Sequence, residues 1–96
     1  MAKAYWISFY RSVSDPAALA AYAKIAGPVI QAGGGRLLVR GEAARAFEAG
    51  VKQRVVVVEF ESVEQAVGVY ESEAYGTALK ALGKGVERDL RIVEGL

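Results

Sequence analysis

Three consecutive glycines at residues 33–35 lead into a strand-like stretch at residues 36–41, and this junction constrains the fold more than any other feature of the chain. The glycines follow a segment with helical spacing and enter one with strand character. A phosphate-binding loop has the reverse order, because its glycines leave a strand and open a helix. We therefore predict no nucleotide site here. Arg36 and Arg40 are in phase in an alternating strand, so we expect them on one face of a sheet.

The same kind of analysis predicts the other elements. Period-two alternation predicts strands over residues 5–11, 54–61 and 89–94. Asp15-Pro16 is a helix start, and the helix is expected to run to the glycines, with a kink or an interruption at Gly27-Pro28. Ser62 opens a second helix with a capping box, and Ser72 caps a further helical segment over residues 73–82. Residues 42–53 form a connection with room for a short edge strand around residues 45–48.

This order of elements predicts an α+β fold. Residues 1–96 are expected to form one domain with a ferredoxin-like βαββαβ arrangement, an antiparallel sheet with its helices on one face. Two crossover helices leave the other face uncovered, and we expect Trp6, Leu38, Val55 and Val57 there. A surface of that kind is more apolar than a monomer usually exposes. A homodimer with two-fold symmetry is the simplest way to cover it.

Composition excludes several classes of function. Twelve Lys and Arg nearly balance eleven Asp and Glu, so we expect neither a nucleic-acid nor a membrane partner. Cysteine and histidine are both absent, which excludes thiol nucleophiles, serine-histidine catalysis and zinc hydrolysis within one chain. No secretory signal and no membrane-length apolar run is visible, so we expect a soluble protein of the cytoplasm.

A metal site is not expected either. The sequence does contain a group of acidic residues, but they do not lie within a metal-coordinating loop, and we expect them on a solvent-exposed face. They are Glu59, Glu61, Glu64, Glu71 and Glu73.

The sequence resembles the DUF1330 family over essentially its whole length. The segments that carry the resemblance are Tyr5-Trp6-Ile7, Asp15-Pro16, Tyr22, residues 34–41, residues 54–60, residues 70–75 and residues 89–95. The resemblance implies a dimeric α+β barrel, and it implies no activity, because the family is one of unknown function. Fold relatives of that barrel include cofactor-free monooxygenases and small lactone isomerases, which is an analogy of fold alone.

The chain departs from the family's usual motif at residues 69–75. The carboxylate that the family places at position 74 is replaced by Ala74, although Glu73 stands beside it. Some relatives carry a histidine where this chain has Glu71. Chemistry that needs that imidazole is therefore not expected here.

A first candidate site combines residues that we expect on one barrel-facing side; they are Trp6, Ser8, Arg40, Glu59 and Arg91. Arg40 would anchor a small anion or a polarised carbonyl, and Trp6 would stack against it. Glu59, the best candidate for a catalytic residue, would orient Arg40 or move a proton, with its pKa raised by burial. The alternative is that Arg40 and Glu59 form a buried structural ion pair.

A second candidate group lies where two helices meet. Tyr70, Ser72 and Tyr75 offer two phenols and a hydroxyl that could bind a ligand at the barrel mouth. The alternative is that Ser72 caps a helix while the tyrosine rings pack in the core. Tyr22 lies on the apolar stripe of the first helix, and we expect it in the core.

The function that these residues favour is binding of a small anionic or carbonyl-bearing ligand by a homodimer, without metal or organic cofactor. One alternative is a cofactor-free monooxygenase or isomerase that uses the same cavity. Another is an interaction module whose interior is filled. A cavity larger than roughly 300 Å³, the lower end for ligand sites, would favour the first two over the third.

Overall fold

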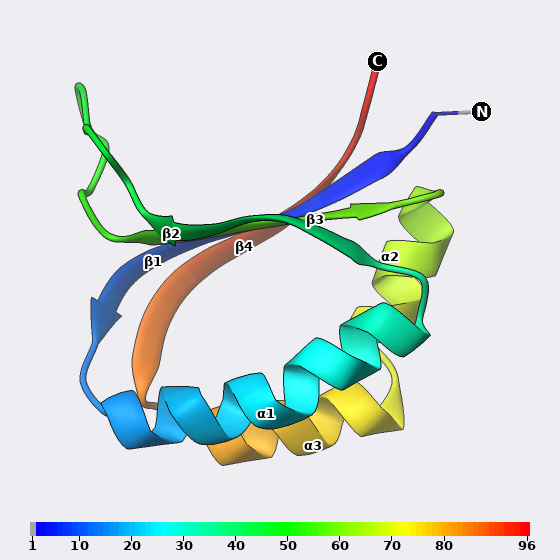
Figure 1. Cartoon of the computed structure of the whole chain (residues 1–96), viewed down its shortest axis with the longest axis horizontal. Coiled ribbons are helices and arrows are strands. Elements are labelled where there is room, and N and C mark those ends of the chain that lie inside the picture. The colour runs from blue at the N-terminus through cyan, green and yellow to red at the C-terminus, as the bar shows by residue number, and fades with distance from the viewer. Residues whose placement is uncertain (1) are drawn as a thin grey trace.

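The computed structural model describes residues 2–96. Its elements are β1 (Ala4–Val13), α1 (Pro16–Ala32), β2 (Arg36–Glu42), β3 (Arg54–Phe60), α2 (Val63–Tyr70), α3 (Glu73–Leu82) and β4 (Val86–Glu94). The strands form one antiparallel sheet in the order β2-β3-β1-β4. Figure 1 shows all three helices on one side of the sheet, with α1 and α3 lying side by side. The predicted α+β, ferredoxin-like fold is confirmed.

The helices begin where the sequence predicts. Asp15 accepts a hydrogen bond from the backbone of the first turn of α1, and Pro16 occupies its first position. Ser62 and Ser72 cap α2 and α3 in the same way. Pro28 does not end α1, which continues to Ala32.

The glycine run ends α1 and brings the chain close to the sheet. Gly34 has φ +93°, a conformation that favours glycine. A Cβ on Gly35 would lie within 3 Å of the side chains of Ile30, Phe60 and Val58. The run is therefore both a helix stop and a point of close packing.

A β-bulge separates the two arginines of β2. Arg36 lies opposite Glu59 of β3, but the register shifts between Leu37 and Val39, and Arg40 lies opposite Val56. Successive residues of a strand point to alternate faces, and Glu59 and Val56 are three residues apart, so their side chains point to opposite faces. The prediction that Arg36 and Arg40 share a face is wrong, because the extra residue of the bulge reverses the alternation.

The main core lies between the sheet and the helices, and Trp6 is part of it. Trp6 is 1% exposed, and its ring contacts those of Phe60 and Tyr75, with centroids 5.9 and 5.1 Å away. The prediction that Trp6 lies on the uncovered face is therefore wrong. The other alternating set of β1, which includes Phe9, takes the uncovered face instead.

The open face of the sheet carries apolar side chains from every strand. Val55 and Val57 lie there, as predicted, in register with Phe9 and Ile7 of β1. Phe9, Val39 and Val93 are each exposed over about half or slightly less of their surface (42, 47 and 51%). The apolar open face that motivated the dimer prediction is thus present, although Trp6 does not contribute to it.

Residues 43–53 form an irregular loop at one end of this face. The edge strand expected around residues 45–48 is absent from it. Figure 1 shows the loop rising on the side of the sheet away from the helices. Phe47, near its tip, is 73% exposed. Among the residues that the structure describes, no helix has the length and apolar character needed to cross a membrane.

Candidate functional site

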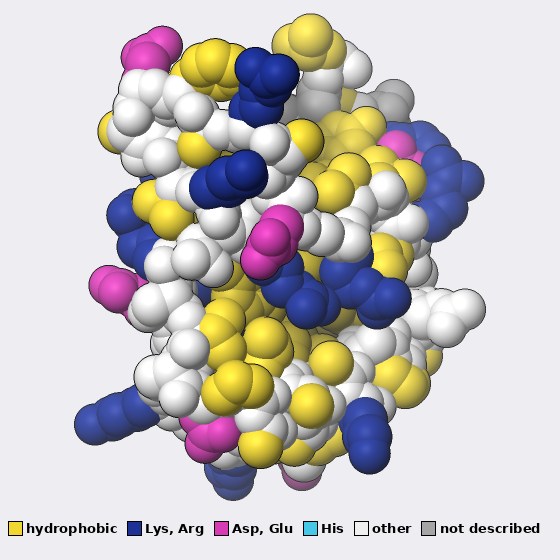
Figure 2. Space-filling view, turned by 60° about the vertical axis from the view of Figure 1, so that its left-hand side comes forward, with side chains coloured by type: hydrophobic (Ala, Val, Ile, Leu, Met, Phe, Trp, Pro, Cys, Tyr) yellow, Lys and Arg dark blue, Asp and Glu magenta, His cyan; other side chains and the backbone are white. Residues whose placement is uncertain are grey.

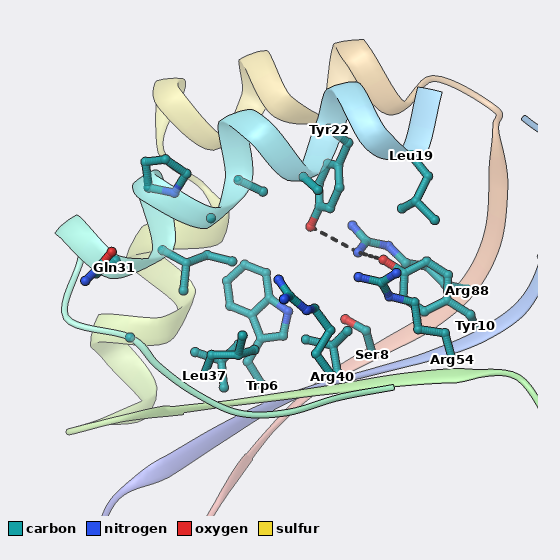
Figure 3. A pocket seen from close by; sticks show the side chains of 18 of the residues that line it. Trp6, Ser8, Tyr10, Leu19, Tyr22, Gln31, Leu37, Arg40, Arg54 and Arg88 are labelled. Carbon is teal, nitrogen blue, oxygen red and sulfur yellow. Dashed lines mark hydrogen bonds between the residues drawn. The ribbon is translucent and has the colours of Figure 1, made fainter. Parts of the chain in front are cut away.

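A cavity of about 470 Å³ lies between α1 and the sheet. Leu19, Tyr22 and Gln31 of α1 form one wall, and side chains of all four strands form the opposite one (Figure 3). The space-filling view shows a hollow on this side of the molecule, with basic side chains along one rim and hydrophobic side chains along the other (Figure 2). The cavity exceeds the lower size limit of ligand sites, roughly 300 Å³.

Three arginines from three strands line the cavity, two of them beside Tyr10 at one end and the third closer to Trp6 (Figure 3). They are Arg40 of β2, Arg54 of β3 and Arg88 of β4. Within residues 2–96, no Asp or Glu oxygen lies within 4.0 Å of their guanidinium groups. Glu42 is the register partner of Arg54, but it is exposed and does not line the cavity. The sheet side of the cavity is therefore strongly positive and lacks a protein counter-charge.

The guanidinium groups of Arg54 and Arg88 both approach the ring of Tyr10. Each guanidinium carbon lies 5.8 Å from the ring centroid, and Figure 3 shows the two side chains converging there. The Nε of Arg54 is enclosed and has no hydrogen-bond partner among the described residues. Buried polar groups of proteins are rarely left in that condition.

Phenol oxygens hold Arg88 in place. Its guanidinium donates to the hydroxyls of Tyr22 (3.2 Å), Tyr75 (3.1 Å) and, more weakly, Tyr10 (3.4 Å). Burial by itself would lower the pKa of Arg88, but the oxygens of Tyr22 and Tyr75 raise it above its usual value. Burial raises the pKa of Tyr75, as does its neighbour Tyr22, against the opposing effect of Arg88. Arg88 is thus charged and Tyr75 neutral over the physiological range.

The hydrogen bonds of this cluster determine what Tyr22 offers to the cavity. Tyr22 and Tyr75 share a hydrogen bond in which either could donate, and both accept from Arg88. Tyr75 is fully buried, and Arg88 has no acceptor, so the hydroxyl proton of Tyr75 is satisfied only if it goes to Tyr22. Tyr22 then uses both lone pairs within the protein. Its own O–H is left to donate to a ligand in the cavity.

Ser8 adds another hydroxyl to the cavity wall. It is the buried polar residue of the sheet, 1% exposed, and it lines the cavity between Trp6 and Tyr10 of β1. The polar end of the cavity therefore presents guanidinium and hydroxyl donors and no carboxylate. Its chemistry suits a ligand that accepts hydrogen bonds and carries negative charge.

The opposite end of the cavity is mainly apolar. Trp6, Val58 and Leu37 line it from the sheet, and Ile30 and Pro28 line it from α1. In Figure 3, Trp6 and Leu37 lie well away from Arg88 and Tyr10. The two ends of the cavity thus differ in chemistry.

The structure brings together only part of the first predicted group. Trp6, Ser8 and Arg40 line the cavity, whereas Glu59 and Arg91 lie on the open face of the sheet. The side chain of Glu59 pairs with Arg36, at 2.9 Å, rather than with Arg40. The expected meeting of Arg40 and Glu59 is therefore wrong, because the register places Arg36 opposite Glu59 and the bulge turns Arg40 to the other face.

The pKa expected for Glu59 is also wrong in sign. Desolvation would raise this pKa, but the hydrogen bond and charge of Lys3, the charge of Arg36 and a hydrogen bond from Tyr5 lower it below its usual value. Glu59 is consequently ionised and paired near neutral pH, which suits an ion-pair role better than proton transfer. Arg91 forms a similar pair with Asp89 on the same face.

Tyr70, Ser72 and Tyr75 do not line the cavity. Ser72 accepts from the backbone N–H of Tyr75 and donates to the carbonyl of Val69. The ring of Tyr70 packs against those of Trp6 and Tyr75. These are the structural roles of the alternative interpretation, and Tyr75 affects the cavity only through Tyr22 and Arg88.

Sequence reasoning missed Arg54, Arg88 and Tyr10 as site residues. A signal was present, because Arg54 is in phase with Val56 and Val58 on the buried side of β3. Arg88 is likewise in phase with the apolar residues of β4 that face the helices. An arginine that continues a buried apolar stripe is a candidate for a functional charge, because charged residues are rarely placed there without a partner.

The comparisons with known proteins agree with this architecture. The model of the domain of unknown function DUF1330 matches residues 3–96. The chain belongs to the DUF1330 family. No curated protein matches its sequence closely enough to count as a relative.

Solved structures resemble this DUF1330 protein in fold. RPA0582 of Rhodopseudomonas palustris, of unknown function, is 21% identical with a TM-score of 0.76, over 99% of this chain and 83% of that one. A dimeric ferredoxin-like protein of unknown function from Thermobifida fusca is 11% identical, with a TM-score of 0.65, over 98% and 92% of the two chains. A Caulobacter crescentus protein provisionally described as an antibiotic biosynthesis monooxygenase is 13% identical, with a TM-score of 0.64, over 99% and 91%. At these identities the likeness concerns the fold alone.

Proposed function

We propose that this DUF1330 protein is a single ligand-binding domain that holds a small organic anion in the cavity between α1 and the sheet. The observation that carries the proposal is that Arg40, Arg54 and Arg88 line one cavity without a carboxylate partner. The proposal invokes neither a metal nor an organic cofactor.

The energetics of buried charge support an anionic ligand. Taking a guanidinium out of water is costly unless hydrogen bonds and an opposite charge compensate. Arg88 obtains hydrogen bonds from phenols but no opposite charge, and the Nε of Arg54 obtains neither. A bound oxyanion would supply both, since its oxygens accept from guanidinium forks and from the Tyr22 hydroxyl.

The alternatives fit the cavity less well. A monooxygenase or isomerase of the cofactor-free type needs a group that takes a proton from its substrate, and neither a carboxylate nor an imidazole lines this cavity. Glu59 lies on the other face of the sheet. An interaction module with a filled interior disagrees with a cavity of about 470 Å³.

A homodimer is the second part of the proposal. The open face exposes Phe9, Val39 and Val93 around the partly buried Val55 and Val57. Pairing two such faces removes apolar surface from water and closes the assembly. The fold neighbour from Thermobifida fusca, described as dimeric, offers a precedent. The cytoplasmic location expected from the sequence stays a prediction.

The test of ligand binding compares wild-type protein with Arg54→Met. Melting temperatures are measured with inorganic phosphate, benzoate and octanoate, each against sodium chloride at the same ionic strength. An anion at ten times its dissociation constant stabilises the native state by about 1.4 kcal/mol, which raises the melting temperature by several degrees. We expect this rise in wild type and in Arg45→Met, whose exposed loop arginine lies outside the cavity, and no rise in Arg54→Met. If no anion stabilises wild type more than Arg54→Met, the proposed function is wrong.

A further inference from the structure

The cavity is long, and its two ends suit chemically different parts of one ligand. It follows α1 from Leu19 to Gln31, a distance of about 18 Å at the usual helical rise. Figure 3 shows Leu19 and Tyr22 beside Arg88 at one end and Gln31 at the other. A small inorganic ion would fill only the first end.

The far end offers little to a second charge. Its walls are the aromatic and aliphatic side chains of Trp6, Ile30, Pro28, Leu37 and Val58. Arg36 is already paired with Glu59 at 2.9 Å, and Arg40 lies where this end meets the charged one, between Trp6 and Arg54 in Figure 3. An apolar group placed against these walls would leave water without losing a hydrogen bond. An anionic group placed against them would lose its hydration and gain no partner from these side chains.

We infer that the ligand is amphipathic, with one oxyanion head at Arg54, Arg88 and Tyr22 and an apolar body that lies along Trp6 beneath the second half of α1. The head is a carboxylate or a phosphate monoester, since both accept from guanidinium forks. This inference rests on the proposed function and deepens it, because anion binding alone would not require the apolar body.

The first experiment measures affinity against chain length by calorimetry. The probes are butyrate, hexanoate and octanoate, with octyl phosphate to compare the heads and octanamide as the uncharged control. Each methylene buried in the apolar half should tighten binding about fourfold, so octanoate should bind at least about tenfold tighter than butyrate. Octanamide should bind at least about tenfold more weakly than octanoate, because it lacks the charge that the arginines require. Octanoate should also change the fluorescence of Trp6, the only tryptophan of the chain, more than butyrate does.

A matched pair of glycine variants tests where the body lies. Gly27 lines the cavity, and a Cβ built on it meets nothing within 4 Å, so the side chain of Gly27→Leu starts in open space. Gly68 of α2 is equally open but lies outside the cavity, which makes Gly68→Leu the control. Gly27→Leu should weaken octanoate about tenfold or more and leave butyrate nearly unchanged, and Gly68→Leu should change neither.

The outcomes separate this inference from the proposed function. If phosphate and the carboxylates bind to wild type and not to Arg54→Met, but affinity does not rise with chain length, the cavity binds anions and the amphipathic ligand is wrong. If octanoate weakens equally in Gly27→Leu and Gly68→Leu, the body does not lie beneath α1, and the inference is also wrong. If no probe binds more tightly to wild type than to Arg54→Met, both proposals are wrong.

Discussion

Replacing Arg54 by methionine should make the ligand-free protein more stable. The enclosed Nε of Arg54 has no partner, and a buried donor in that state costs about 1–3 kcal/mol. Methionine keeps an unbranched stem of similar shape but removes the donor and the charge. The loss of the Arg54 cation–π contact with Tyr10 opposes this gain by about 0.5–1 kcal/mol. The net expectation is a free energy of unfolding higher than that of wild type by up to about 2.5 kcal/mol.

Urea unfolding followed by the fluorescence of Trp6 measures this difference at equal protein concentrations. The slope of the free energy with urea should stay unchanged, because the substitution alters little buried area. Arg45→Met, at an exposed loop position, should stay within about 0.5 kcal/mol of wild type. A bound anion should reverse the order by stabilising wild type alone. If Arg54→Met is instead less stable than wild type by more than about 1 kcal/mol without ligand, Arg54 is a structural residue and the reasoning fails.

Four further outcomes follow from other parts of the fold. Light scattering should give twice the 10.2 kDa monomer mass for wild type and the monomer mass for Phe9→Asp, and a wild-type monomer would refute the dimer. Gly35→Ala should lower the free energy of unfolding by roughly 1–3 kcal/mol, and the melting temperature with it, because the new Cβ would lie within 3 Å of three core side chains. Ser72→Ala should cost about 1 kcal/mol in urea unfolding through loss of the α3 cap, and an unchanged midpoint would contradict that role. The pKa of Glu59 is lowered from 4.5, so the stability that its ionised form contributes is present above pH 4.5 and is lost as the pH falls through the lowered pKa. Glu59→Gln should therefore make the free energy of unfolding depend less on pH in the acid range.

Much of the fold could be predicted from local sequence signals. Asp15-Pro16, Ser62 and Ser72 mark helix starts because their side chains satisfy free backbone N–H groups, and this chemistry is local. The glycines of residues 33–35 end α1 for a similarly local reason. Once these elements are known, their order leaves few topologies, and the ferredoxin-like arrangement is the simplest.

The facing of β1 could not be predicted in the same way. Its two alternating sets, one with Tyr5 and Phe9 and the other with Trp6 and Tyr10, are both aromatic. Alternation distinguishes faces only when one is polar, and here the open face is apolar as well. The choice depends on which set fits against Tyr75 and Phe60, a contact between residues far apart in the sequence.

The bulge in β2 had the largest effect on the candidate site. Without it, Arg36 and Arg40 would share the open face with Glu59, as strict alternation predicts, although the register would still place Arg36, and not Arg40, opposite Glu59. The extra residue between Leu37 and Val39 leaves Arg36 to neutralise Glu59 on the open face and turns Arg40 toward the helices. Arg40 thereby joins Arg54 and Arg88 in a cavity that no carboxylate lines. A single irregularity of register thus separates the paired charges of the open face from the unpaired charges of the cavity, and the unpaired charges are the ones available to a ligand.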